Sequence, residues 1–289
     1  MARGGRLFDL VVMVDWSAAS RPGPPKETAD QIWIAWGTRR GRPAPVYCRT
    51  RREAENRLHD LLRRCAGNAL VGFDFPNAYP QGSGLGGGRL LARRLSALIE
   101  DGADNRNNRF AVAAELNFAL GAPPGPFWMC PKGAAGPALT VKRPPFAHRA
   151  YGEHRLVERH LWARRKYPHT VWKLGGAGSV GSQTLLGLPV LYRLLTAPDL
   201  AERSWLWPFE TNWDESLDGV IHAEIWPSLF PFAEQPHAIK DARQVMAVRD
   251  LLLDADGNRL RTWFGAPACL SATERRICRD EEGWILGVH

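Results

Sequence analysis

The chain has 289 residues, which corresponds to one large or two small domains at about 150 residues each. A hydrophobic content of 45%, with 12 Trp and 11 Phe, excludes intrinsic disorder, and no apolar run is long enough to span a membrane. The net charge of +8 is uneven, since residues 1–198 carry 29 Lys and Arg against 14 Asp and Glu, and residues 199–289 carry 9 against 16. The basic part favours an anionic partner, nucleic acid or a nucleotide, although an excess of Arg is equally consistent with genome composition.

The cysteines predict free thiols. There are five, an odd number, they are widely spaced, and none forms a C-x-x-C pair. This pattern argues against a disulfide framework and against a zinc ribbon, and it predicts a cytoplasmic protein.

Four apolar runs and one amphipathic helix are expected in the first 80 residues. The runs are FDLVVMVDWS (8–17), QIWIAWGT (31–38), PVYCRT (45–50) and ALVGFDFPNAYP (69–80), and the helix covers residues 51–67. The order is therefore β-β-β-α-β, which differs from the regular alternation of a dinucleotide-binding fold. No G-x-G-x-x-G follows the first strand, where such a fold requires it.

The remaining chain predicts a helix-rich middle and a regular end. Helices are expected at 107–121, 152–167 and 183–196, the last with a break near Pro189, and KLGGAGSVGS (173–182) is a glycine-rich loop. The end of the chain predicts strands at 204–210 and 219–230 and helices at 237–255 and 271–279.

Acidic residues occur where these apolar strands end. Asp15 ends the first strand, Asp74 ends the fourth, Glu224 lies in the late strand, and Asp241 opens the following helix. An acid within an apolar strand is costly to bury unless it is paired or binds a metal ion. Because Mg²⁺ and Mn²⁺ prefer oxygen ligands, the four acids are candidate catalytic residues and metal ligands. The alternative is that each acid caps a helix or pairs with an arginine.

The segments VVMVDWSAAS, VGFDFPNAYP and EIWPSLFPF with IKDARQVMAV resemble the DUF429 family of predicted ribonuclease H-like nucleases. The resemblance implies an α/β fold, a ribonuclease H-like mixed sheet flanked by helices with a large helical and irregular insertion. It places the core at 1–80 and 204–289 and a basic inserted subdomain at 81–203. It also implies phosphodiester hydrolysis with Mg²⁺ or Mn²⁺ held by Asp15, Asp74, Glu224 and Asp241.

Several residues are candidates for binding the phosphates of a substrate. Lys173 and Ser179 lie in the glycine-rich loop, whose backbone N–H groups could surround a phosphate, although the sequence favours a simple flexible loop. Lys240 precedes Asp241 and could orient a phosphate. A basic segment with Trp162 and Tyr167 interleaved could hold nucleic acid or be a solvated helix face; its basic residues are Arg143, Arg149, Arg155, Arg159, Arg164, Arg165 and Lys166.

The late strand also carries His222, which faces the same side as Glu224 and is either a hydrogen-bonded structural residue or a ligand or proton shuttle. The sequence thus favours a metal-dependent nuclease. Two other functions remain open. One is a nucleotide-binding phosphotransferase or ATPase of the related actin-like superfamily. The other is a non-catalytic binding protein, which would show an acidic pocket that is incomplete or blocked by an arginine.

Overall fold

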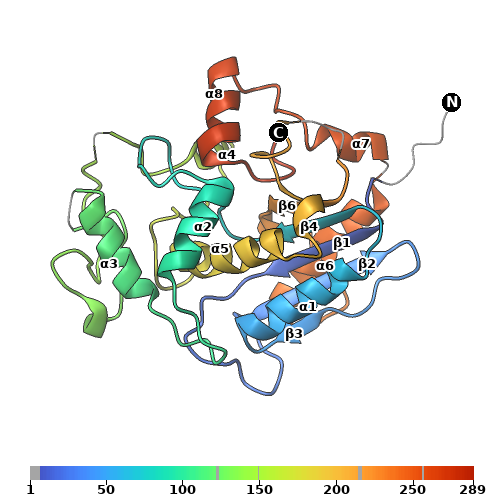
Figure 1. Ribbon diagram of the computed structural model, residues 1–289, viewed down its shortest axis with the longest axis horizontal. Coiled ribbons are helices and arrows are strands. Elements are labelled where there is room, and N and C mark those ends of the chain that lie inside the picture. Colours follow the sequence, from blue (N-terminus) through green and yellow to red (C-terminus); the bar gives the residue numbers. More distant parts are fainter. Residues whose placement is uncertain (1–6, 122–123, 149, 214–216, 256) are drawn as a thin grey trace.

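The structure is a computed structural model that describes residues 7–121, 124–148, 150–213, 217–255 and 257–289. A six-stranded mixed sheet forms its centre, with the spatial order β3-β2-β1-β4-β6-β5 (Figure 1). Strand β2 is antiparallel to both of its neighbours, β1 and β3. Strands β1, β4, β6 and β5 run parallel to one another. The strands are β1 Leu10–Asp15, β2 Ile32–Thr38, β3 Val46–Cys48, β4 Ala69–Phe73, β5 Ser204–Leu206 and β6 Val220–Glu224.

Helices cover both faces of this sheet. Figure 1 shows α1 and α5 in front of the strands and α6 behind them. The α-helices are α1 Arg51–Arg63, α2 Gly88–Leu98, α3 Arg109–Ala119, α4 Leu156–Ala163, α5 Val180–Thr196, α6 Lys240–Asp254, α7 Gly257–Thr262 and α8 Ala272–Ile277. Among the described residues, no helix is long and apolar enough to cross a lipid bilayer.

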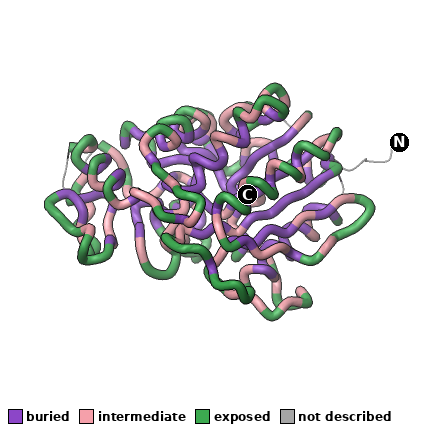
Figure 2. Tube along the Cα trace, turned by 60° about the horizontal axis from the view of Figure 1, so that its bottom comes forward, coloured by how far each residue is buried: buried purple, intermediate pink, exposed green. Residues whose placement is uncertain are grey.

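Alternation along the strands divides the core in two, and Figure 2 shows the central strands as buried. In β1, Val12 and Val14 point to the core shared with α1 and α5, whereas Val11 and Met13 point to the core shared with α6. Successive side chains of a strand point to opposite faces, so each apolar strand serves both cores. The same alternation decides on which side of the sheet each acidic side chain lies.

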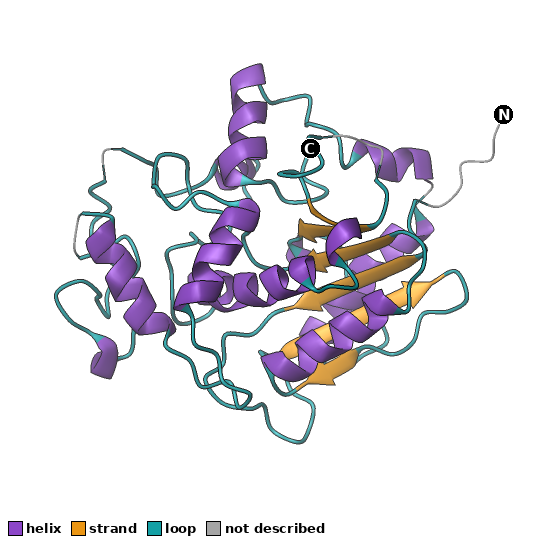
Figure 3. Ribbon diagram, in the orientation of Figure 1, coloured by secondary structure: helices purple, strands orange, loops and turns teal. Residues whose placement is uncertain are grey.

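The predicted α/β class is confirmed, and the predicted strands and helices match the observed elements in order and type (Figure 3). The predicted break near Pro189 is wrong, since α5 continues from Val180 to Thr196 with Pro189 inside it. Helix α2 had no sequence prediction, although Leu91, Ala92 and Leu95 form its buried face. The cysteines are all free, as predicted.

The predicted insertion, residues 81–203, is closely tied to the sheet. Its helix α5 packs on β5 and against α1, and α2 packs on α5. Leu185, Leu188 and Leu191 of α5 belong to the same core cluster as the strands. Side chains of residues 81–203 therefore complete one of the two layers that cover the sheet.

Candidate active site

Two acidic residues lie side by side where parallel strands end. Asp15 is the last residue of β1, and Asp74 directly follows β4. Val14 is opposite Phe73 in the parallel register, and the Asp74 N–H donates to the carbonyl of Val14 at 3.2 Å. By alternation both acids point to the face covered by α6, because Met13 and Leu70 on that side belong to the α6 core. The sequence prediction that strand ends bring these two acids together agrees with this placement.

The two carboxyl groups share a hydrogen bond, and their charges are poorly compensated. Burial, followed by the negative charge of Asp241, raises the pKa of Asp15 to about 8. Burial, followed by the charge of Asp15, raises the pKa of Asp74 well above its ordinary value. The N–H of Trp16 donates to Oδ1 of Asp74 at 2.6 Å. Because two adjacent carboxylates repel each other, the pair retains at least one proton at neutral pH.

Asp241 supplies a third carboxyl group from the helix that covers this face. It is the second residue of α6, where a negative charge interacts favourably with the helix dipole. The N–H of Asp30 donates to its Oδ2 at 2.6 Å, and Ser17 Oγ donates to the carbonyl of Asp30 at 3.1 Å. Burial raises the pKa of Asp241 as well. The loop after β1 thus holds Asp241 near the strand-end pair.

Glu224 lies at the same end of the sheet but has a different partner. It pairs with Phe73 in register, so its side chain points to the opposite face from that of Asp74. Both its oxygens accept hydrogen bonds from the buried guanidinium of Arg155, at 2.6 and 2.8 Å. Glu224 therefore lines a pocket together with Asp74, but its carboxylate is bound by Arg155 and not by the aspartates. Successive side chains of a strand point to opposite faces of the sheet, and Glu224 is level with Phe73, one position before Asp74.

Arg155 forms the centre of a buried ionic network. Its Nε donates to Glu158 at 2.9 Å, and its Nη1 also donates to the carbonyl of Glu282. Two carboxylates face one guanidinium, and burial raises the pKa of Glu224 even though Arg155 opposes the shift. Arg155 was predicted to belong to a basic face for nucleic acid. This interpretation is wrong for Arg155, because only 1% of the residue is exposed.

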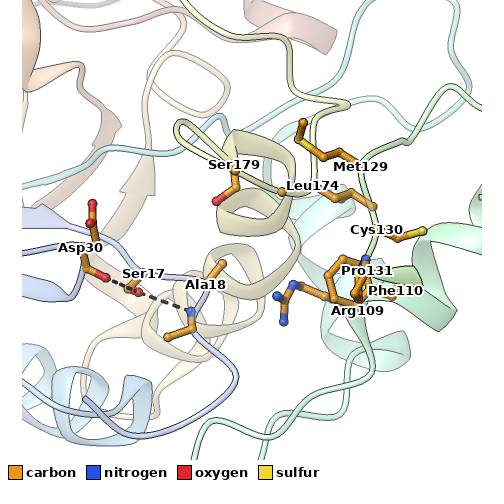
Figure 4. A pocket seen from close by; sticks show the side chains of 13 residues that line it. Ser17, Ala18, Asp30, Arg109, Phe110, Met129, Cys130, Pro131, Leu174 and Ser179 are labelled. Carbon is orange, nitrogen blue, oxygen red and sulfur yellow. Dashed lines mark hydrogen bonds between the residues drawn. The ribbon is translucent and has the colours of Figure 1, made fainter. Parts of the chain in front are cut away.

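Two pockets lie near the aspartates, one lined by Asp74 and the other by Asp30, whose N–H binds Asp241. One, of about 390 Å³, is lined by Asp74, Glu224, Lys240 and Gln183 among others. The other, of about 420 Å³, is lined by Ser17, Asp30, Arg109, Gly175 and Ser179 among others (Figure 4). The first turn of α5 and the glycine-rich loop before it separate the pockets, since Gln183 lines one and Ser179 the other. Of the three aspartates, Asp74 is the one that lines the first pocket, and none of them lines the second.

The remaining predicted substrate-binding residues fall into two groups. Lys240 and Ser179 each line one of the two pockets. The ammonium of Lys173 instead donates to the carbonyl of Ala177 and holds the glycine-rich loop together. Arg143 pairs with Glu153 on the surface, and Arg165 is exposed in the turn after α4. Neither of these two arginines lines a pocket beside the aspartates, and Arg149 lies outside the described residues.

His222 shares the face of Glu224, as its strand position predicted. Its ring stacks on Phe73, and neither ring nitrogen has a hydrogen-bond partner among the described residues. Burial, followed by the charge of Arg89, lowers the pKa of His222 to about 3, so the ring is neutral. It lies on the opposite side of the sheet from the aspartate pair. The expected hydrogen bond of a structural histidine is not found in the described part of the chain.

Two residues near the aspartates were missed by sequence reasoning. Asp30 follows an irregular, proline-containing stretch and has a positive φ of 59°, and no motif distinguishes it. Arg109 opens α3 about ninety positions after β1 and faces the pocket beside Ser17. An isolated arginine at the start of a predicted helix carries no signal of function in a single sequence.

The described part of the chain contains no group of three or more His, Cys, Asp or Glu side chains already placed to hold a metal ion. Asp15 and Asp74 touch each other, and Asp241 is held by the Asp30 amide. Comparison with known proteins adds no further information: no family model, no curated protein and no solved structure matches this chain. The resemblance drawn from the motifs therefore rests on those residues alone.

Proposed function

We propose that this protein hydrolyses phosphodiester bonds of nucleic acid, using Mg²⁺ or Mn²⁺ held by Asp15, Asp74 and Asp241. One observation carries the proposal: the carboxyl groups of Asp15 and Asp74 are in hydrogen-bond contact at adjacent ends of parallel strands. When both carboxyl groups are ionised they repel each other, and a cation bound between them would remove this repulsion. Perturbed carboxyl pKa values beside a pocket are typical of functional sites.

The donor chemistry of the three aspartates fits a hard divalent cation. All their side-chain donors are carboxylate oxygens, which are the ligands that Mg²⁺ and Mn²⁺ prefer. The positive charge of Lys240 opposes the rise in pKa of both Asp15 and Asp241. Because the strand-end pair retains a proton, cation binding must release it, and the third carboxylate must be held in reach. The Asp30 amide provides that support for Asp241.

The residues of the site divide the work of hydrolysis. A divalent cation bound here would activate water and stabilise charge on the phosphate. Asp15 and Asp74 would hold it from the strands, and Asp241 from the helix. The exposed Lys240 lines the pocket beside Asp74 and would attract the negative phosphate of a substrate. The Trp16 amide fixes the orientation of the Asp74 carboxyl group.

The strand order supports a ribonuclease H-like architecture as part of this proposal. An antiparallel β1-β2-β3 meander continues through β1 into the parallel strands β4 and β6. Acids at the ends of the first and fourth strands match the motifs from which the resemblance was drawn. The free cysteines support a reducing compartment such as the cytoplasm.

A second candidate function is a non-catalytic binding protein with the same fold. The observation that favours it is the ion pair between Arg155 and Glu224, because the arginine binds one of the four acids predicted to hold metal. The two candidates differ in what Asp74 does. In a binding protein, Asp74 affects stability alone, whereas in a nuclease it is needed for turnover.

The test is hydrolysis of single-stranded DNA, RNA and branched DNA in the presence of Mn²⁺. Wild type is compared with Asp74→Asn and with Asp60→Asn, an exposed α1 carboxylate that serves as the matched control. The proposal predicts cleavage of at least one substrate by wild type and Asp60→Asn, and loss of cleavage in Asp74→Asn or with EDTA. Cleavage that persists in Asp74→Asn would refute the proposal, and no cleavage of any substrate would favour the binding protein.

A further inference from the structure

The pocket beside Asp30 has a positively charged wall that the proposed chemistry does not use. Figure 4 shows Arg109 and Asp30 on opposite sides of this pocket, with Ala18 between them and Ser179 at its rim. Its volume of about 420 Å³ is large enough for a small polar ligand. Phe110, Met129 and Leu174 supply apolar surface around the charged groups. The pocket is thus polarised, with the cation of Arg109 at one end and the carboxylate of Asp30 at the other.

Arg109 is a buried cation whose charge is not neutralised. It is 9% exposed, and in the part of the chain that the structure describes it has no ion-pair partner. Its Nε donates to Ser182, and its Nη1 donates to Ser20 and Asn107, which are all neutral. No partner is found there for Nη2. Burial, followed by the positive charge of Arg51, lowers the pKa of Arg109 to about 10.

The negative charge of Asp101, which opposes the lowering of the Arg109 pKa, is already paired with another arginine. Asp101 accepts two hydrogen bonds from Arg51, at 2.6 Å each, and Arg51 is almost fully buried. Two guanidinium groups therefore lie near a single carboxylate. Contact with the ring of Phe110, 4.3 Å from the guanidinium carbon, is the remaining electrostatic support for Arg109. A buried charge is normally paired, so the pocket lacks an anion.

The facing wall is the glycine-rich loop that leads into α5. Gly176 and Gly178 have positive φ values of 69° and 66°, and a Cβ on Gly178 would lie 1.9 Å from His169. Lys173 holds the loop from inside through the carbonyl of Ala177. Ser179 is the N-cap of the 17-residue helix α5, and its side chain makes no capping hydrogen bond. The positive end of the helix dipole is therefore directed at the pocket rim.

We propose that this pocket binds a phosphate group of a nucleotide or polynucleotide, held between Arg109 and the N-terminus of α5. Nη2 of Arg109 and the hydroxyl of Ser179 donate to the phosphate oxygens, and the helix dipole adds attraction. A polynucleotide that continues from this phosphate past Ala18 would reach Asp30, whose N–H binds Asp241 of the proposed metal site. The identity of the ligand as a substrate rests on the proposed function, whereas phosphate binding itself does not.

The test is a titration with inorganic phosphate, without divalent metal and with EDTA, followed by thermal unfolding and calorimetry. A ligand that binds the folded state alone raises the melting temperature with concentration. The variants are Arg109→Met and Ser179→Asp. Aspartate is a favourable N-cap residue, so Ser179→Asp keeps α5 stable while it places a negative charge in the phosphate site. Arg106→Met is the control, because Arg106 is exposed and pairs with Asp104.

The expected result is a phosphate response in wild type and Arg106→Met and an apparent Kd at least about tenfold higher in both pocket variants. A 5′-mononucleotide should bind in the same manner, and its nucleoside should not. Absence of a phosphate response in wild type, or an unchanged Kd in Ser179→Asp, would overturn the proposal. The metal-free conditions separate this outcome from failure of the nuclease proposal. If Arg109→Met does not fold, Ser179→Asp decides.

Discussion

The carboxyl groups of Asp15 and Asp74 hydrogen-bond each other at neighbouring ends of β1 and β4. This contact follows from the parallel register, which sets Val14 opposite Phe73 and so places the next residue of each strand on the same face. Two acids in contact cannot both ionise without repulsion. The arrangement therefore lowers the stability of the folded protein as the second proton is lost.

The first prediction concerns the pH dependence of stability. Both acids have a folded-state pKa above the value in an unfolded chain, so the folded state binds their protons more tightly. Their contribution to the free energy of unfolding is fully present below about pH 4. It is lost as pH rises through about 8, the folded-state pKa of Asp15. Denaturant unfolding between pH 4 and 9, without divalent cations, measures this decline.

The substitution Asp74→Asn tests the same pH dependence of stability more directly. The amide keeps an oxygen for the Trp16 N–H and a donor for Asp15, but it cannot ionise. At pH 8 the variant should be more stable than wild type by at least about 1 kcal/mol, since one pKa unit corresponds to about 1.4 kcal/mol. At pH 4 the difference should be small. A variant that is less stable than wild type at pH 8 would contradict the shared-proton interpretation.

The second prediction concerns the buried network around Arg155. Replacing Arg155 by Met leaves the buried carboxylates of Glu158 and Glu224 without their counter-ion. The free energy of unfolding at pH 7 should fall by about 3–5 kcal/mol. The double variant Arg155→Met/Glu224→Gln should recover part of the loss because it removes one stranded charge. Urea unfolding of both variants measures this, and a loss below about 1 kcal/mol for the single variant would contradict it.

The third prediction tests whether Glu224 belongs to the metal site. Because both its oxygens are bound by Arg155, Glu224→Gln should keep the Mn²⁺-dependent rise in melting temperature. Asp241→Asn, in contrast, should reduce that rise. The two variants are compared in the same Mn²⁺ titration. Equal loss in both would restore Glu224 as a ligand and would mean that Arg155 moves away when the metal binds.

The fourth prediction concerns Lys240. Its ammonium is exposed and lines the pocket next to Asp74, so Lys240→Met should weaken attraction of a polyanionic substrate and leave folding unchanged. KM should rise several-fold, with a weaker dependence of kcat/KM on salt, while kcat changes little. Steady-state kinetics at two salt concentrations measure this. An unchanged KM would show that Lys240 does not contact the substrate phosphates.

Much of the site could be predicted because local sequence patterns determine it. An acid directly after an apolar run marks the end of a buried strand, and this signal identified Asp15 and Asp74. Asp241 was found because it opens a strongly amphipathic helix. The face to which each strand-end side chain points depends on register. Register is set by pairing between strands distant in sequence, so the separation of Glu224 from Asp74 could not be read from spacing.

The residues that sequence reasoning missed or misassigned act through tertiary contacts. Arg155 lies in a basic segment and has the pattern of an exposed residue, yet it is buried in ion pairs with Glu158, three positions later, and with Glu224 of the distant strand β6. Arg109 is placed by α3 beside the first turn of α5, about seventy positions later, through its bond to Ser182. Of these partners, Glu158 is close in sequence, but Glu224 and Ser182 lie about seventy positions away from the arginines that they bind. A charged side chain is assigned to the interior only when its counter-ions are known.

The most direct test of the account is a Mn²⁺ titration of wild type, Asp74→Asn and Asp60→Asn, followed by thermal unfolding at pH 6 and pH 8.5. Wild type and Asp60→Asn should gain melting temperature, and more at pH 8.5, because the metal must displace the proton shared by Asp15 and Asp74. Asp74→Asn should gain little at either pH. A wild-type melting temperature that does not respond to Mn²⁺ at pH 8.5, or an equal response in Asp74→Asn, would contradict a metal site at the strand ends.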